Sequence, residues 1–396
     1  MIDPIVGEKN QQASAILKEK GVDAWLVFVR ETAAMADPTL ELILGTGCTW
    51  QSAFIMTAAG DTVAIVGSLD VPNIEESGNY ARVIGYTASI REELQKVLKE
   101  IDPQKIALNF STNDYMSDGL THGMFLLLQD YLKDTPYPAR FVSSEPIVSA
   151  LRGRKSPTEI ARIRESIRIT EEIYDKVTGF LRPGQTEKEI AAFIKKEFEN
   201  YGVEPAWDPV MCPSVFTGPE TAGAHFGPTD RKTERGHIIN MDFGVRKENY
   251  CSDMQRTWYF LKENETQAPP DVQKGFDVLR DSIQLAAQAI RPGMAGWEID
   301  KVARDHIVNN GFEEYPHALG HQVGRLAHDG GGLLAPQWDR YGDLPFQPIE
   351  VGQVYTIEPR LTVEGHGVVT MEEMIVVREN GAEFLSHPQT KLWLIE

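Results

Sequence analysis

The sequence of 396 residues contains a unit that occurs twice, 109 positions apart. Residues 181–184, Leu-Arg-Pro-Gly, recur at 290–293 as Ile-Arg-Pro-Gly, and Glu189 has its counterpart in Glu298. Apolar residues at helical spacing surround both copies, so each copy predicts a helix, a Pro-Gly turn and a second helix. We therefore expect a domain made of two related halves, although a duplicated fold by itself specifies no activity.

A glycine-led strand pattern follows each copy and reaches an acid six residues after the glycine. The acid is Asp242 in the first copy and Glu358 in the second. A second acid comes later in each copy, Asp253 in the first and Glu372 in the second. The two copies therefore offer one pair of carboxylates each.

The second acids lie in apolar runs that predict continuous strands, over 250–260 in the first copy and over 368–377 in the second. We expect each strand to form a hairpin with the strand before it, which brings the two acids of a copy together. Because side chains alternate along a strand, Glu372 and Glu373 should face opposite sides, so only one of them can join the cluster.

Four acids in otherwise apolar strands predict a metal site. An isolated ionised carboxylate is very unfavourable in an apolar interior, so a buried group of four needs cations. Oxygen-rich clusters suit hard or borderline divalent metals such as Mn, Co or Zn. The alternative is that each acid lies on the solvent face of its strand, and we disfavour it because all four are found at duplicated positions.

Histidines supply candidate nitrogen ligands. His317, His321 and His328 fall in one glycine-rich segment, and His225 lies among small residues further upstream. Glycine lets the backbone pass close to a bound group, which fits a binding site. The other five histidines have no comparable surroundings and are expected to be structural.

Length and local pattern predict two domains. A chain of this size exceeds the usual limit of a single core. Residues 1–150 alternate helical and strand patterns, with a buried strand at 24–30 and a hairpin over 52–66, which predicts a small α/β domain. Residues 151–396 carry the duplicated unit, and a capping-box pattern from Ser156 to Glu159 opens their first helix. The predicted class is α/β (α+β).

Composition excludes several classes of partner. A net charge of −19 argues against nucleic acid and against an anionic membrane surface, because both bind basic faces. No apolar run is long enough to cross a bilayer, and the first residues do not follow a signal-peptide pattern. Three widely separated cysteines predict neither a disulfide framework nor a cysteine metal site. We expect a soluble, cytoplasmic protein.

In combination, these motifs resemble those of the pita-bread metallopeptidases, a family of Xaa-Pro aminopeptidases, prolidases and methionine aminopeptidases. The motifs are the Asp242–Asp253 spacing of eleven, His317-x-x-Gly-His321-x-x-Gly, Ile357-Glu358-Pro359 and Met371-Glu372-Glu373. Residues 1–150 resemble the creatinase-type N-terminal domain of the Xaa-Pro members, which favours a proline-directed peptidase over a methionine aminopeptidase. The resemblance covers nearly the whole chain.

The resemblance implies a set of site residues and a reaction. It implies two divalent metal ions per subunit, with Mn preferred and Co or Zn as alternatives, and a homodimer acting on small peptides. A hydroxide shared by the metals would attack the bond before proline. The implied metal ligands are Asp242, Asp253, His321, Glu358 and Glu372.

The resemblance also implies roles outside the ligand set. Glu358 would accept a proton from the attacking water. His225 and His328 would position the substrate and stabilise the tetrahedral oxyanion, and His317 would line the proline pocket.

Two positions depart from the family pattern. Many relatives have arginine two residues before the last glutamate, where this chain has Thr370, and glycine after Glu-Pro, where it has Arg360. We expect Arg360 to supply the missing guanidinium and to contact either a substrate carboxylate or a metal-ligand carboxylate; an exposed arginine at a strand end is the alternative. The departures leave the substrate open, so a metal-dependent hydrolase or lyase of a non-peptide small molecule is the second hypothesis. A non-catalytic binding module is the third, and it is disfavoured because this chain keeps all five ligands that the resemblance implies.

Overall fold

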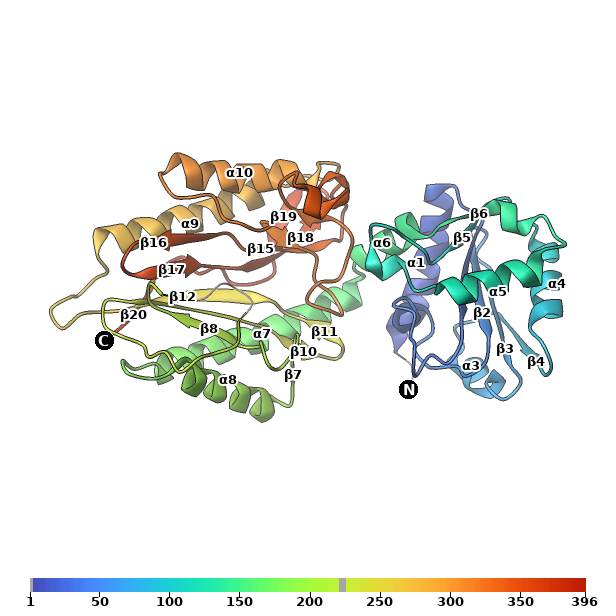
Figure 1. Cartoon of the computed structure of the whole chain (residues 1–396), viewed down its shortest axis with the longest axis horizontal. Helices are drawn as coiled ribbons and strands as arrows, with labels where there is room; N and C mark the ends of the chain where they lie inside the picture. The colour runs from blue at the N-terminus through green and yellow to red at the C-terminus, as the bar shows by residue number, and fades with distance from the viewer. Residues whose placement is uncertain (1–2, 221–225) are drawn as a thin grey trace. The chain divides into compact units, whose positions relative to one another are not determined.

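The computed structural model describes residues 3–220 and 226–396 (Figure 1). The chain divides into two compact units, one ending at Arg152 and the other comprising Gly153–Glu396. No helix in the described part of the chain is long and apolar enough to cross a membrane.

The N-terminal unit is built around a six-stranded mixed sheet with the order β4-β3-β2-β1-β5-β6. Strand β2 is antiparallel to both of its neighbours, and the remaining pairs are parallel. The strands are β1 (Ala24–Val29), β2 (Ser52–Thr57), β3 (Thr62–Gly67), β4 (Arg82–Tyr86), β5 (Ile106–Leu108) and β6 (Phe141–Ser143). The buried strand and the hairpin expected from the sequence are both confirmed.

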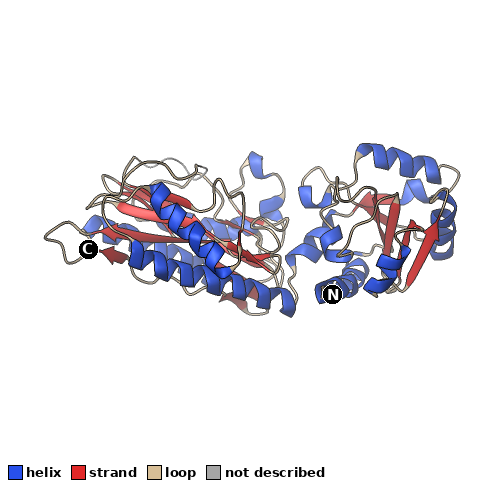
Figure 2. Cartoon of the chain, turned by 90° about the horizontal axis from the view of Figure 1, so that it is seen from below, coloured by secondary structure: helices blue, strands red, loops and turns tan. Residues whose placement is uncertain are grey.

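Helices cover both faces of this sheet (Figure 2). They are α1 (Pro4–Lys20), α2 (Leu40–Ile43), α3 (Val71–Ser77), α4 (Arg91–Ile101), α5 (His122–Leu132) and α6 (Glu145–Gly153). Trp25 and Val27 of β1 pack in a core with α1, α2, α3 and α6, whereas Leu26 and Phe28 pack in a second core with α4 and α5. Because both faces are covered, β1 is apolar throughout instead of alternating.

The C-terminal unit contains two helix pairs that correspond to the two copies of the repeat. They are α7 (Pro157–Phe180) with α8 (Glu187–Tyr201), and α9 (Pro270–Ala289) with α10 (Gly296–Asn309). The Pro-Gly turns have the same backbone, since Gly184 and Gly293 both have φ of 90°. Such positive φ values favour glycine, which explains the repeated Pro-Gly.

The predicted helix starts are confirmed by their capping contacts. Ser156 and Glu159 form a capping box at α7, and Thr186 and Glu189 form another at α8. The second copy keeps only half of this device, because Ala295 has no hydroxyl and its backbone N–H donates to Glu298 at 2.8 Å.

Strands fill the space between the two helix pairs, with α7 and α8 on one side and α9 and α10 on the other (Figure 1). The strands of the first copy are β7 (Glu204–Pro205), β8 (Ser214–Thr217), β9 (Ile238–Phe243), β10 (Val245–Lys247), β11 (Tyr250–Cys251) and β12 (Met254–Phe260). Those that follow are β13 (Gly320–His321), β14 (Leu333–Leu334), β15 (Val354–Ile357), β16 (Arg360–Val363), β17 (Gly367–Thr370), β18 (Glu373–Arg378), β19 (Gly381–Phe384) and β20 (Trp393–Ile395).

The strands of the C-terminal unit form several small sheets. The orders are β20-β12-β9-β8, β15-β18-β19, β11-β10-β7, β13-β14 and β16-β17. Two equivalent hairpin pairs carry the repeat, because β9 pairs antiparallel with β12 and β15 pairs antiparallel with β18. The chain passes from one small sheet to another several times, and these transitions position the acids.

Candidate metal centre

Each of the four candidate carboxylates lies where the chain passes from one sheet to the next. Asp242 is the penultimate residue of β9, just before β10 begins a different sheet, and Asp253 separates β11 from β12. Glu358 lies between β15 and β16, and Glu372 lies between β17 and β18. The continuous strands expected over 250–260 and 368–377 are therefore wrong in detail, since each is interrupted beside its acid.

Contacts between the two halves cause these interruptions. At the first break, the Ser252 N–H donates to the Val245 carbonyl, while the Asp253 N–H points to Met374 Sδ at 3.3 Å. At the second break, the Glu372 N–H donates to the carbonyl of Gln255 at 3.1 Å. The N–H groups of Asp253 and Glu372 themselves therefore point to the other copy instead of continuing their own ladder, whereas Ser252 stays bonded to its own copy.

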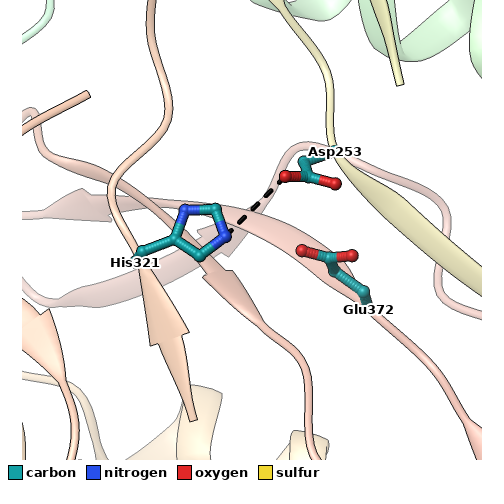
Figure 3. A group of neighbouring side chains, drawn as sticks. All are labelled: Asp253, His321 and Glu372. Atoms are coloured by element: carbon teal, nitrogen blue, oxygen red, sulfur yellow. Dashed lines mark ion pairs between the residues drawn. The ribbon is translucent and has the colours of Figure 1, made fainter. Parts of the chain in front are cut away.

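The acids meet His321, which comes from β13. His321 Nε2 lies 3.3 Å from Glu358 Oε1 and 3.7 Å from Asp253 Oδ2. Ligand atoms of Asp253, His321 and Glu372 all lie within 4.8 Å of one another, and their side chains converge from three segments of the chain (Figure 3). The structure thus brings together three of the five expected ligands in one group, with Glu358 in contact with its histidine.

The donor set fits a divalent metal by two independent observations. First, Asp242 Oδ1 and Glu372 Oε2 are buried and have no hydrogen-bond partner among the described residues. Second, His321 Nδ1 lies 3.3 Å from the carbonyl of Gln322, so in the neutral ring Nδ1 carries the proton and Nε2 is free to bind a metal. Buried acceptors that lack donors are stabilised by a cation.

The electrostatics of the cluster point in the same direction. Burial, reinforced by neighbouring carboxylates, raises the pKa of Asp242 and Glu372 well above their ordinary values. Burial also raises the pKa of Asp253 to about 7, although His321 opposes the shift. Burial alone would raise the pKa of Glu358 too, but its contacts with His321, together with the charges of His317 and His328, outweigh burial and lower it. Three acids of the cluster thus hold protons more tightly than usual when no cation is present.

The structure describes two of the other three candidate histidines, His328 and His317. His328 packs edge-to-face on His321, with ring centroids 4.1 Å apart. His317 Nδ1 lies 2.8 Å from the carbonyl of Ala318, and burial lowers the pKa of its ring, which is therefore neutral at physiological pH. His225 lies outside the described residues.

Arg360 begins β16, two residues after Glu358, and is partly buried. Burial lowers the pKa of its guanidinium. Its charge acts on the ring of His317, so Arg360 lies at the edge of the candidate site.

Three supporting side chains were not identified from the sequence. Gln255 donates to Glu358 Oε2 at 3.2 Å and thereby fixes that carboxylate. Arg304 of α10 donates to the carbonyls of Tyr315 and His317, and Asp300 beside it accepts from the Leu319 N–H. The position of Gln255 two residues after Asp253 and the i,i+4 spacing of Asp300 and Arg304 were the signals available in the sequence.

The family model described as metallopeptidase family M24 matches residues 161–379, more than half of the chain. The protein belongs to this family. Enzymes of family M24 use divalent metals, which agrees with the donor set found here.

Individual relatives match this M24 peptidase over most of its length. An uncharacterized peptidase of Staphylococcus haemolyticus is 30% identical over 337 residues, covering 85% of this chain and 87% of the relative. An uncharacterized peptidase of Staphylococcus saprophyticus is 29% identical over 387 residues, covering 96% of this chain and 99% of the relative.

Solved structures show the same fold. An X-Pro aminopeptidase from Thermotoga maritima has a TM-score of 0.70 at 23% identity, over 98% of this chain and 99% of that one. A Xaa-Pro dipeptidase from Bacillus anthracis has a TM-score of 0.72 at 22% identity, over 98% and 100%. The expected architecture, a creatinase-type N-terminal α/β domain followed by a duplicated pita-bread domain, is confirmed.

Without metal, this M24 peptidase is expected to become less stable as pH rises from about 5.5 to 8. Asp253 has a folded pKa of about 7 against an ordinary value of 3.8, so its contribution to stability is complete below pH 4 and disappears as pH approaches 7. Asp242, Glu372 and His321 also have raised pKa values and change stability in the same direction. Glu358 opposes them only at lower pH, because its pKa is lowered.

The measurement is thermal unfolding in EDTA and in excess Mn²⁺ at several pH values. We expect Mn²⁺ to raise the unfolding midpoint more at pH 8 than at pH 5.5, by about 4 °C or more, because metal binding displaces protons from the cluster. A gain from Mn²⁺ that is equal at the two pH values would contradict a carboxylate site.

Proposed function

We propose that this M24 peptidase hydrolyses the bond preceding proline at the amino end of short peptides, as a Xaa-Pro dipeptidase or aminopeptidase. The observation that carries the proposal is the buried cluster of Asp253, His321 and Glu372, in contact with Glu358. It is set in a fold whose solved neighbours include proteins named X-Pro aminopeptidase and Xaa-Pro dipeptidase, matched over nearly their whole length.

We propose that the cluster holds two divalent ions per subunit, with Mn²⁺ the first candidate and Co²⁺ or Zn²⁺ the alternatives. An oxygen-rich set with one histidine accepts several such metals. Bound ions of this kind supply Lewis-acid polarisation and lower the pKa of a water molecule. The proposed ligands are Asp242, Asp253, His321, Glu358 and Glu372.

Glu358 is the proposed proton acceptor. In the metal-free cluster its contacts with His321 lower its pKa, and a carboxylate that is ionised near neutral pH can take a proton from the attacking water. The amide of Gln255, 3.2 Å from Glu358 Oε2, holds the carboxylate in one orientation.

The three histidines outside the ligand set are proposed to act on the substrate. Neutral His317 directs its Nδ1 proton to the Ala318 carbonyl, so Nε2 is left as an acceptor toward the proline pocket. His328 and His225 are proposed to position the scissile carbonyl and to stabilise its oxygen as negative charge develops. Arg304 keeps the segment of His317 in place through two backbone carbonyls.

The proposed state of the protein is a homodimer in a reducing compartment such as the cytoplasm. The supporting observation for the compartment is that all three cysteines are buried free thiols. Light scattering of the purified protein tests the dimer directly.

The proposed reaction is tested with Mn²⁺-reconstituted protein on Xaa-Pro dipeptides, Xaa-Pro tripeptides and matching Xaa-Ala peptides. We expect release of the first amino acid from proline peptides, with kcat/KM at least about tenfold above that for Xaa-Ala, as a shaped apolar pocket allows. Absence of turnover on every proline peptide, with about two metals bound per chain as in a two-metal site, would refute the proposal and favour a small-molecule hydrolase. Metal content near zero after reconstitution would instead indicate a binding module.

A further inference from the structure

Arg360 and Thr370 lie side by side on one face of the β16–β17 ladder. In this ladder Arg360 is directly opposite Thr370, and Leu361 is opposite Val369. Leu361 and Val369 belong to the apolar core. Because neighbouring side chains on a strand point to opposite faces, Arg360 and Thr370 face away from that core, with β-carbons about 5 Å apart.

Both side chains have unused hydrogen-bonding capacity. Thr370 is only 8% exposed, and its hydroxyl oxygen has no hydrogen-bond partner among the described residues. Arg360 is partly buried, and among residues 3–220 and 226–396 no carboxylate pairs with its guanidinium, whose pKa is shifted by burial alone. A planar guanidinium next to a hydroxyl is a donor arrangement that suits a carboxylate.

Two buried arginines of this unit differ from Arg360 in having a carboxylate partner within the protein. Arg304 pairs with Asp300 at 2.7 Å, and Arg256 pairs with Glu373 at 3.1 Å. A charge removed from water without a partner is unfavourable. Since the protein supplies a counter-ion to these arginines and none to Arg360, the missing anion is expected to come from a ligand.

The position of Arg360 limits which ligand this can be. The guanidinium pairs neither with Glu358, two residues earlier in the chain, nor with Glu372, two residues after Thr370. The sequence indicates two possible contacts for Arg360, a substrate carboxylate and a metal-ligand carboxylate. The structure does not show the second. Arg360 follows Glu358 by two residues and Thr370 precedes Glu372 by two, so the unused donors lie beside the centre where the peptide would be cleaved, and the charge of Arg360 acts on the ring of His317.

We propose that Arg360 and Thr370 bind the α-carboxylate of the substrate, which makes the enzyme selective for dipeptides. In a dipeptide the carboxylate follows the scissile bond by one residue, whereas a longer peptide has a neutral amide at that place. This inference rests on the proposed peptidase function and specifies its substrate class.

The test compares Ala-Pro with Ala-Pro amide and Ala-Pro-Ala on the Mn²⁺-reconstituted protein. The wild type should prefer the free dipeptide, and Arg360→Met should lower kcat/KM for it by about 100-fold, mainly through KM, as expected when one partner of a desolvated charge pair is removed. The same variant should change turnover of the amide very little. Arg360→Met that lowers all three substrates equally would contradict a carboxylate site.

Matched variants separate charge, geometry and folding. Arg360→Lys keeps the charge but loses the paired donors and should recover only part of the lost kcat/KM. Thr370→Val should weaken the dipeptide alone, by about tenfold for one hydrogen bond to a charged group. Arg378→Met, at an exposed arginine that pairs with Glu383 at 2.6 Å, should match the wild type.

A binding measurement distinguishes failure of this inference from failure of the proposed function. Calorimetric titration of the Mn²⁺-loaded protein with L-proline and L-prolinamide should show tighter binding of the acid by the wild type, and this preference should be absent in Arg360→Met. Turnover of all three peptides without preference for the dipeptide would sink the inference and keep the peptidase. Absence of turnover with a retained, Arg360-dependent preference for the acid would refute the peptidase and support the carboxylate site.

Discussion

Replacing Glu372 by glutamine is expected to abolish hydrolysis while making the metal-free protein more stable. Glutamine keeps the size of the side chain but removes a charge from the metal site, and kcat/KM should fall on the order of 1000-fold, since several kcal/mol of Lewis-acid stabilisation are lost at about 1.4 kcal/mol per factor of ten. Metal content measured by elemental analysis should fall with it.

The gain in stability has a separate cause. Burial beside Asp253, Glu358 and Asp242 raises the pKa of Glu372 well above its ordinary value, so above neutral pH the metal-free cluster is unfavourable. A neutral glutamine removes that penalty, and its amide can donate to a neighbouring carboxylate. In EDTA at pH 8 the midpoint of thermal unfolding should therefore rise, and a lower midpoint than wild type would contradict the proposed site.

Replacing the adjacent Glu373 by glutamine is expected to have the opposite effects. Glu373 forms a buried ion pair with Arg256 at 3.1 Å and also accepts hydrogen bonds from the Ser386 hydroxyl and the Gln389 N–H. Glutamine leaves the Arg256 charge without its counter-ion, which should lower the free energy of unfolding by about 3 kcal/mol. Urea titration measures this change.

The comparison of the two glutamates is the informative part. Folded Glu373→Gln should bind metal with the wild-type stoichiometry and keep kcat close to wild type, because its side chain contributes no ligand. Loss of metal in Glu373→Gln with retention in Glu372→Gln would mean that the ligand had been assigned to the wrong residue. The sequence expectation that the two face opposite sides is confirmed by their different partners, since Glu372 lies in the metal-ligand group and Glu373 pairs with Arg256.

Helix starts and the buried N-terminal strand could be predicted because they depend on local chemistry. Ser156 caps α7 with contacts to a residue three positions away, and β1 is apolar on both faces because helices cover it. The breaks in the strands at Asp253 and Glu372 could not be predicted, for the opposite reason. Asp253 and Glu372 interrupt their strands because their backbone contacts the other copy of the repeat, and no local pattern records such a distant contact.

In the candidate site, the motif residues could be predicted from the sequence and the supporting side chains could not. The motif residues His321 and Glu358 lie in contact, as a shared site requires. The buried pairing of Asp300 with Arg304 and the amide of Gln255 were missed, because an ordinary helical i,i+4 pair and a single glutamine do not reveal what they hold. The unpaired donors of Arg360 and Thr370 became visible only when the register of β16 and β17 placed them together.

The passage of the chain between sheets at every acid has a consequence for the origin of this domain. Each copy of the repeat provides two acids, and the contact from Glu372 to Gln255 joins one copy to the other. A single copy would therefore carry only half of a centre. A chain of half the length would assemble four acids only by pairing with a second copy of itself about a two-fold axis. In one continuous chain, only one half has to carry His317, His321 and Arg360, which a symmetric pair would carry twice.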